Sequence, residues 1–430
     1  MAAEEHLDKK LTTKILLGLL LGAFAGVLAH AVAGPSPRLV WVVEKVTQPA
    51  GQIWLRSLIM IVVPLVFASL TLGVAGLGDI RKLGRIGLKT VSYFLATTAV
   101  ATLIGLLLVN AVRPGAGLPQ ETREDLLARF SGQAQQMAQQ AGQTQFGVEL
   151  LVNIVPRNPV AAAANFDMLG LIFFSLIFGA ALSILPEARA RPLLGVLEAV
   201  GDAVVVIIHW VMKLAPYGVF ALIFSVTALF GYDLLRKLLW YVLTVLAGLL
   251  VHFLGVYSIL VHFLGRMNPL DFFARTKTII VTAFSTSSSS ATLPTTLQVT
   301  ERNLGVPREI CGFVLPLGAT MNMHGTALFE GVTVLFIAQV FGVTLSLETQ
   351  LVVVVMAVLI AIGTAGVPSG SIPLLMIVLQ VVGLPPESIA LVLGVDRILD
   401  MCRTTLNVTG DVTAALYVAR SEGYRLDPGS

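Results

Sequence analysis

The sequence predicts an all-α integral membrane protein, and its composition carries that prediction. Of 430 residues, 56% are hydrophobic and 12% are charged. An ordinary soluble domain has about twice that charged share, so a soluble fold of this length could not cover its surface. The net charge of +3 comes without a dense basic cluster and gives no reason to expect a nucleic-acid partner. The two cysteines, Cys311 and Cys402, form neither a zinc spacing nor a disulfide framework.

The chain begins with a polar segment, residues 1–14, which carries three lysines and precedes an apolar run from Ile15 to about Ala33. The basic flank and the residues Ala31-Val32-Ala33 also fit a cleaved secretory signal. The apolar run is as long as a membrane span, however. We therefore interpret it as the first transmembrane helix, entering from the cytoplasm.

Five further apolar stretches follow and predict five more spans. They lie near residues 53–77, 91–112, 165–185, 200–230 and 236–264. The connections after the second, fourth and sixth spans carry arginine or lysine, which the positive-inside rule places in the cytoplasm. The polar stretch at 113–145 is rich in Gln, Gly and Ala and predicts a surface loop.

Two later apolar segments are interrupted at their middle by small residues. The first, 278–298, is broken by the serine-rich run 285–290, and the second, 351–382, by the Gly/Ser/Pro run 363–371. Each arm of about 10–15 residues reaches roughly 15–22 Å, short of the ~30 Å hydrocarbon core. Such arms predict re-entrant hairpins, whose tips must be buried in protein or line a wet cavity. The alternatives are a low-complexity linker for the serine run and a plain loop between two full helices for the second segment.

Each predicted hairpin is followed by a helix with polar residues, 316–330 after the first and 396–411 after the second. Interrupted segments at matching positions of two halves indicate the binding site of a secondary transporter. On the second helix, five polar side chains share a stripe about 80° wide: Asp396, Asp400, Arg403, Asn407 and Asp411. Facing lipid, the charged ones would cost about 10 kcal/mol, so they must face the protein interior. The excess of acid over base leaves room for a cation, whereas a structural Asp–Arg network is the alternative.

Helix 316–330 carries polar groups as well. Three of them share one face: Asn322, Thr326 and Glu330. Gly318 and Gly325 bracket a stretch where the helix can unwind and free carbonyl oxygens, the ligand type that hard cations prefer. His324 points to another face. For His324 and Glu330, a hydrogen bond to backbone is the simpler alternative.

Four motifs in fixed order resemble the dicarboxylate/amino acid:cation symporter family, which includes the glutamate transporters. They are residues 285–294, 322–326, 363–368 and 400–411, and residues 64–69 are similar too. The resemblance covers nearly the whole chain. It implies eight transmembrane helices and two re-entrant helical hairpins, built as inverted repeats and assembled as a homotrimer that works as an elevator. The second hairpin would be the extracellular gate.

The same resemblance implies a division of the chain into parts. Scaffold helices 1–2 would occupy 1–77, transport-domain helix 3 would occupy 78–112, and scaffold helices 4–5 with an external loop would occupy 113–233. Residues 234–420 would complete the transport domain, and 421–430 would form a C-terminal tail.

The resemblance also implies a substrate site, formed by Ser288, Ser289, Thr326, Gly366, Asp400, Arg403, Thr404 and Asn407. Arg403 matches the position that takes the substrate's side-chain carboxylate, for which a guanidinium fork is suited. Asp400 matches the partner of the α-ammonium group. We therefore expect aspartate or glutamate as substrate, with a C4-dicarboxylate as the alternative.

Two sodium sites are implied in addition. One would use Gly318, Asn322, Asn407 and Asp411, and the other Thr320, Met323, Ser369 and Ser371. His324 stands where many members have Asp, and Phe94 stands where a Tyr helps a third site, which argues against a third sodium. We hypothesise that a proton takes over part of the coupling through Glu330 or His324. No resident cofactor is expected, only transported Na⁺ and H⁺.

These expectations describe a multi-pass protein of the cell (inner) membrane, in contact with lipid and without enzymatic activity. An intramembrane aspartyl protease would hold its two acids on different helices, whereas Asp396 and Asp400 share one. A channel, the remaining alternative, would need a continuous pore rather than gated tips.

Overall fold

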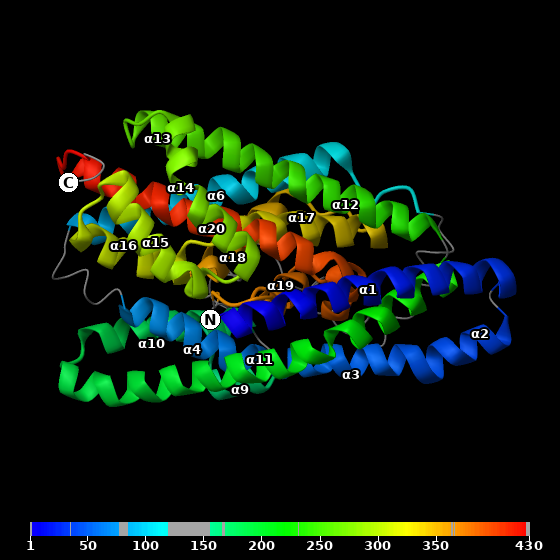
Figure 1. Cartoon of the computed structure of the whole chain (residues 1–430). Helices are drawn as coiled ribbons and strands as arrows, with labels where there is room; N and C mark the ends of the chain where they lie inside the picture. The colour runs from blue at the N-terminus through cyan, green and yellow to red at the C-terminus, as the bar shows by residue number, and fades with distance from the viewer. Residues whose placement is uncertain are drawn as a thin grey trace.

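The structure is a computed structural model that describes residues 2–34, 36–76, 85–118, 155–165, 168–230, 232–362, 364 and 366–426. Within these residues every regular element is a helix (Figure 1), as the sequence predicts. Arg81 and Lys82, on which part of the predicted orientation depends, and most of the predicted 113–145 loop lie outside the described residues.

The helices pack in two groups. The first lies along the lower half of Figure 1 and comprises α1 (Ala2–Ala33), α2 (Pro37–Val42), the π-helical η1 (Val43–Thr47), α3 (Gln48–Ile59), α4 (Val62–Gly76), α9 (Pro159–Ala164), α10 (Met168–Ile184) and α11 (Glu187–Phe230). In this group α1, α3 and α4 pack against α11, and α10 packs against α4.

The second group lies above the first in Figure 1. It comprises α6 (Arg85–Val112), α12 (Tyr232–Leu250), the π-helical η3 (Val251–Val256), α13 (Tyr257–Phe263), α14 (Pro269–Thr286), α15 (Ser289–Leu304), α16 (Arg308–Met321), α17 (His324–Phe341), α18 (Leu347–Ala361), α19 (Ile372–Val381), η4 (Pro386–Ile389) and α20 (Ala390–Ser421). Its centre is formed by α17 and α20, which pack against each other and are covered by α6, α12, α14, α16 and α18.

Six described segments are long and apolar enough to cross a membrane: Thr13–Ala33, Pro37–Leu72, Arg85–Val112, Glu187–Leu229, Leu235–Phe263 and Arg308–Phe341. They contain all or most of the predicted spans one, two, three, five and six, together with the helix that follows the first hairpin. The fourth predicted span is the shorter apolar helix Gly170–Ile184. The polar stripe on α20 lowers the hydropathy of that helix, so hydropathy alone misses it.

The most apolar-looking spans are not the most buried. The apolar stretch of 18 residues within Arg308–Phe341 is 94% buried, whereas that within Glu187–Leu229 is only 22% buried. Because the buried segment holds the predicted polar positions, they are shielded inside the second group. Helix α11 begins at Glu187, well before residue 200, where the predicted span begins. Its 44 residues make it about 66 Å long.

A stripe of three glycines joins α1 to α11. The three are Gly18, Gly22 and Gly26. A Cβ on the first would lie 2.4 Å from the carbonyl oxygen of Pro216, and one on the second 2.7 Å from that of Phe220. Small residues let two helix backbones approach closely in a membrane. Since the contacts advance together along both chains, α1 and α11 run parallel.

Both interrupted segments form a pair of helices with a non-helical tip. Helices α14 and α15 are antiparallel, because Asn303 Nδ2 donates to the Arg275 carbonyl at their base (3.0 Å) while Thr286 and Thr292 lie 2.9 Å apart at the tip. Ser287, with φ +50, ends α14, and the Ser288 hydroxyl caps α15 by accepting from the Ala291 N–H (3.1 Å).

The linker interpretation of the serine run is therefore wrong. The arms of the first pair, with 18 and 16 residues, are longer than predicted, because α14 begins among polar residues that precede the apolar segment. In the second pair α18 has 15 residues and α19 has 10, about 22 and 15 Å. Neither of these helices could span a bilayer alone.

The glycine stripe predicts a stability effect. Gly22→Leu should destabilise the protein by about 1–3 kcal/mol, since the new side chain would meet the α11 backbone. The measurement is the thermal unfolding midpoint of purified protein. Gly195→Leu is the matched control, because a Cβ on Gly195 of α11 has no neighbour within 4 Å. Equal midpoints for the two variants would contradict the packing described.

Candidate functional site

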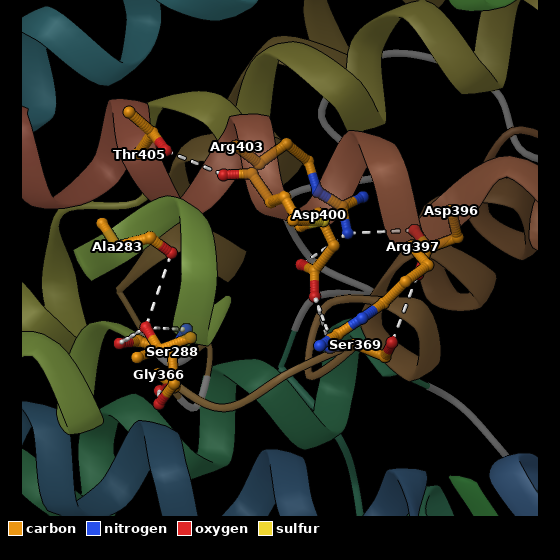
Figure 2. A network of polar contacts seen from close by, with 11 residues as sticks. Ala283, Ser288, Gly366, Ser369, Asp396, Arg397, Asp400, Arg403 and Thr405 are labelled. Carbon is orange, nitrogen blue, oxygen red and sulfur yellow. Dashed lines mark hydrogen bonds and ion pairs between the residues drawn. The ribbon is translucent and has the colours of Figure 1, made fainter. Parts of the chain in front are cut away.

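The two helix-pair tips touch each other near α20. The Ser288 hydroxyl donates to the Gly366 carbonyl oxygen (2.6 Å), and the Ser290 N–H donates to the same oxygen (3.1 Å) (Figure 2). A Cβ on Gly366 would lie 2.8 Å from both the Ala319 carbonyl and the Ser290 hydroxyl. A side chain larger than glycine at position 366 would therefore meet the first tip and the Ala319 carbonyl.

A fully buried arginine lies next to the tips (Figure 2). Arg403 Nη2 donates to Asp400 Oδ1 (2.8 Å) and lies 2.9 Å from Asp396 Oδ1. Its guanidinium carbon is 3.9 Å from the centroid of the Phe329 ring. Among the described residues, its Nε and Nη1 find no hydrogen-bond partner although they are buried. Buried donors without a partner are costly, and a guanidinium with unused donors is suited to a carboxylate ligand.

Asp400 and Asp396 also hold the second tip. Asp400 Oδ2 accepts from the Ser369 N–H (2.9 Å), and Asp396 Oδ2 accepts from the Ser369 hydroxyl (3.3 Å). Arg397 Nη1 lies 3.8 Å from Asp400 Oδ2. Ser369 has φ +58, a left-handed conformation that is uncommon outside glycine and is held here by these bonds. Both carboxylate oxygens of Asp400 therefore have protein partners.

The polar helix after the first pair is broken as predicted. Helix α16 ends at Met321 and α17 begins at His324, with Asn322 and Met323 in non-helical conformations. Asn407 of α20 fills the break, since its Oδ1 accepts from the Gly325 N–H (2.7 Å). The Asn407 amide nitrogen donates to Met323 Sδ (3.2 Å) and Thr326 Oγ1 (3.3 Å).

A buried acid, Asp411, lies next to the same break in the helix. Asp411 Oδ1 accepts from Asn322 Nδ2 (2.8 Å), and a Cβ on Gly318 would lie 2.4 Å from that Asp411 oxygen. Asn322 Oδ1 is buried without a hydrogen-bond partner among the described residues. A carboxylate and an unused amide oxygen beside a broken helix are the oxygen ligands that a hard cation needs.

Most of the residues expected to form a second cation site are hydrogen-bonded to other groups. Thr320 is exposed, and its hydroxyl donates to the Leu317 carbonyl (3.0 Å). The Ser371 hydroxyl is buried, and within the described part of the chain it has no partner. Met323 is engaged with Asn407, and Ser369 with the two aspartates. The remaining expected substrate residues, Ser289 and Thr404, are buried.

His324 sits in a pocket of hydroxyl groups. Its Nε2 lies 2.6 Å from Thr97 Oγ1 and its Nδ1 lies 2.7 Å from the Tyr257 hydroxyl. The side-chain partners exclude the simpler expectation of a bond to backbone. His252, on the π-helical η3, lies 5.3 Å from His324 between ring centroids and has no partner for either ring nitrogen among the described residues. Sequence reasoning missed Tyr257 and His252, although their polar atoms in an apolar span were a usable signal.

Glu330 is fully buried on α17. Neither of its carboxylate oxygens has a hydrogen-bond partner among the described residues, so the backbone-bonded alternative is wrong for this residue too. An ionised carboxylate in such a position would carry a large desolvation cost. The group is therefore suited to hold a proton.

A broken helix, two small-residue tips and a buried stripe with unused polar groups converge at one place. Discontinuous helices around a buried binding site are typical of many secondary transporters. The sequence comparisons agree with this class. The chain belongs to the sodium:dicarboxylate symporter family, whose sequence model matches residues 11–421.

Named relatives match over almost their whole length. The chain is 36% identical to the "Proton/glutamate-aspartate symporter" of Escherichia coli (strain K12), covering 97% of this chain and 94% of that protein. It is 35% identical to the "Proton/sodium-glutamate symport protein" of Bacillus caldotenax, covering 96% and 94%. It is 32% identical to the "C4-dicarboxylate transport protein" of Bacillus subtilis (strain 168), covering 97% and 94%.

The Asp411 cluster predicts a cation response. Asp411→Asn keeps the shape and the acceptor for Asn322 but removes the charge, so the apparent affinity for sodium should fall about tenfold or more. The measurement is the rise of the unfolding midpoint with sodium concentration. Asp202→Asn, at an exposed position of α11, is the control and should titrate like the unmodified protein. An unchanged sodium titration in Asp411→Asn would contradict the assignment.

Proposed function

We propose that the protein is a secondary active symporter that takes up aspartate or glutamate together with sodium, with protons sharing the coupling. One observation carries the proposal: among the described residues, Nε and Nη1 of the buried Arg403 guanidinium find no hydrogen-bond partner, although they lie near the two tips, which contact each other. The names of the relatives support the same substrate class.

The two charges of the site suit the two ends of an acidic amino acid. Arg403 is suited to the side-chain carboxylate and Asp400 to the α-ammonium, while hydroxyl and backbone groups of the tips would take the α-carboxylate. One observation favours a C4-dicarboxylate as the second candidate. Asp400 already has Ser369 and Arg403 as partners and does not require an ammonium group.

The proposed architecture has eight transmembrane helices and two re-entrant hairpins in the cell (inner) membrane, with a cytoplasmic N-terminus. The short helices α18 and α19 support it, and so does the packing of the helices, which is denser within each group than between the groups. Residues 1–77 and 113–233 would form the scaffold of a homotrimer. Residues 78–112 and 234–420 would move as an elevator, followed by the tail 421–430.

Coupling to more than one ion follows from energetics. A 10⁴-fold gradient of substrate costs about 5.5 kcal/mol, whereas one charge crossing 100 mV returns about 2.3 kcal/mol. Sodium would bind at Asp411, and a proton at Glu330, with His324 as the alternative carrier. The hydroxyl partners that fill the surroundings of His324 support the view that no third sodium binds there.

The substrate proposal is tested by uptake into proteoliposomes. Arg403→Lys keeps the charge but removes the fork, and Arg403→Cys removes both, so each should lower aspartate uptake by about 30-fold or more. Unlabelled aspartate, glutamate and succinate serve as competitors and rank the two candidate substrates. Arg189→Lys, at an exposed position of α11, is the control. Normal aspartate uptake by Arg403→Cys would show that the pocket is wrongly assigned.

The proton proposal is tested with sodium and pH gradients imposed separately. Uptake by the unmodified protein should accelerate with an inward proton gradient, and Glu330→Gln should lose that response because it can no longer bind and release the proton. Glu348→Gln, exposed in the first turn of α18, is the control. If Glu330→Gln responds and His324→Asn does not, His324 is the carrier. Uptake that ignores pH in the unmodified protein removes the proton from the mechanism.

A further inference from the structure

Arg397 of α20 is a second cation close to the expected substrate residues. It is buried, with 6% of its surface exposed. Its Nη1 lies 3.8 Å from Asp400 Oδ2, whereas Arg403 Nη2 lies 2.8 Å from Asp400 Oδ1 (Figure 2). Each carboxylate oxygen of Asp400 therefore has its own guanidinium neighbour. An ammonium group of the substrate would meet an acid that already has two cations beside it.

The charge of this cluster depends on which candidate substrate is bound. Asp396 and Asp400 carry two negative charges, and Arg403 neutralises one of them. An acidic amino acid adds two carboxylates and one ammonium group, whereas a C4-dicarboxylate adds the carboxylates alone. Without Arg397, a dicarboxylate would leave one more negative charge uncompensated in a buried place, which is costly. The Arg397 guanidinium carries the positive charge that the missing ammonium would have supplied.

The position of Arg397 suits such an exchange. Asp400 Oδ1 accepts from Arg403, so an ammonium group would have to approach Oδ2. Oδ2 accepts from the Ser369 N–H (2.9 Å), and Arg397 lies 3.8 Å from it, beyond hydrogen-bonding distance. A movement of about 1 Å would bring Arg397 into a direct bond with Oδ2. The guanidinium and an ammonium group would thus compete for one oxygen.

A cavity gives Arg397 room to withdraw from Asp400. The cavity has a volume of about 860 Å³ and lies between α1 and α11 on one side and Pro368 and Arg397 on the other. The described residues that line it include the basic Lys14 and Lys213 and no acid. A guanidinium is therefore drawn toward Asp400 when no ammonium is bound there, and it has space on its other side when one arrives.

We propose that Arg397 is a specificity-determining residue that lets one site take both C4-dicarboxylates and acidic amino acids. With a dicarboxylate bound, Arg397 bonds to Asp400 Oδ2 in place of the absent ammonium group. With aspartate or glutamate bound, the ammonium takes that oxygen and Arg397 turns toward the cavity. This inference rests on the proposed function, because it requires that Arg403 binds a carboxylate and that Asp400 binds the ammonium group.

Binding of aspartate and of succinate to the purified full chain tests the proposal. The rise of the unfolding midpoint with each ligand, at one saturating sodium concentration, gives the two apparent affinities. The unmodified protein should bind both. Arg397→Gln should bind succinate about tenfold or more weakly and aspartate at least as well as before. Arg397→Lys keeps the charge and should retain succinate binding. Arg189→Gln, exposed on α11, is the control and should bind both ligands like the unmodified protein.

A second background tests whether Arg397 acts through Asp400. In Asp400→Asn no acid is left unpaired by succinate, so adding Arg397→Gln should change succinate affinity by less than about threefold. A full loss in that background would overturn the proposal. Equal losses for both ligands in Arg397→Gln would indicate a structural role and overturn it, as would unchanged succinate binding.

The unmodified protein separates this proposal from the proposed function. If it binds aspartate but not succinate, the role of Arg397 is refuted and the proposed function stands. If it binds succinate alone or neither ligand, both are refuted.

Discussion

The ion cluster of Arg403 with Asp396 and Asp400 is the interaction on which the rest of the structure depends. Three charged side chains on one helix can exist inside a membrane protein only if protein surrounds them and they pair. This requirement places α20 at the centre of the second group, packed against α17 and the first helix pair. The pairing is incomplete, because Nε and Nη1 of Arg403 stay without partners among the described residues. The incomplete pairing leaves guanidinium donors for the carboxylate that we propose as part of the substrate.

Close approach of backbones is the second constraint. Gly318 lets Asp411 reach the broken helix, and a Cβ on Gly325 would lie 2.6 Å from the Arg403 carbonyl oxygen. Glycines thus bring polar groups together inside the second group, whereas the α1 stripe holds two apolar helices in register in the first. Glycines at close contacts thus bring polar groups together in the second group and let two helices pack tightly in the first.

The periodic features were readable from the sequence. Spacings of four, three, four and four put the polar stripe from Asp396 to Asp411 on one face, and burial of that stripe confirms the prediction. The serine run and the break at Asn322 were visible as interruptions of apolar segments. Contacts between distant segments were not, because helical periodicity says nothing about which faces meet. The bonds of Tyr257 to His324 and of Ser369 to Asp400 depend on such contacts, as does the extension of α11.

The central claim is that Arg403 receives a carboxylate of the substrate next to the two tips. The most direct measurement is a cryo-electron microscopy map of the protein prepared with sodium and saturating aspartate. The account predicts ligand density between Gly366 and α20, with a carboxylate within hydrogen-bonding distance of the Arg403 guanidinium. Aspartate bound elsewhere, with the donors of Arg403 still unoccupied, would contradict it.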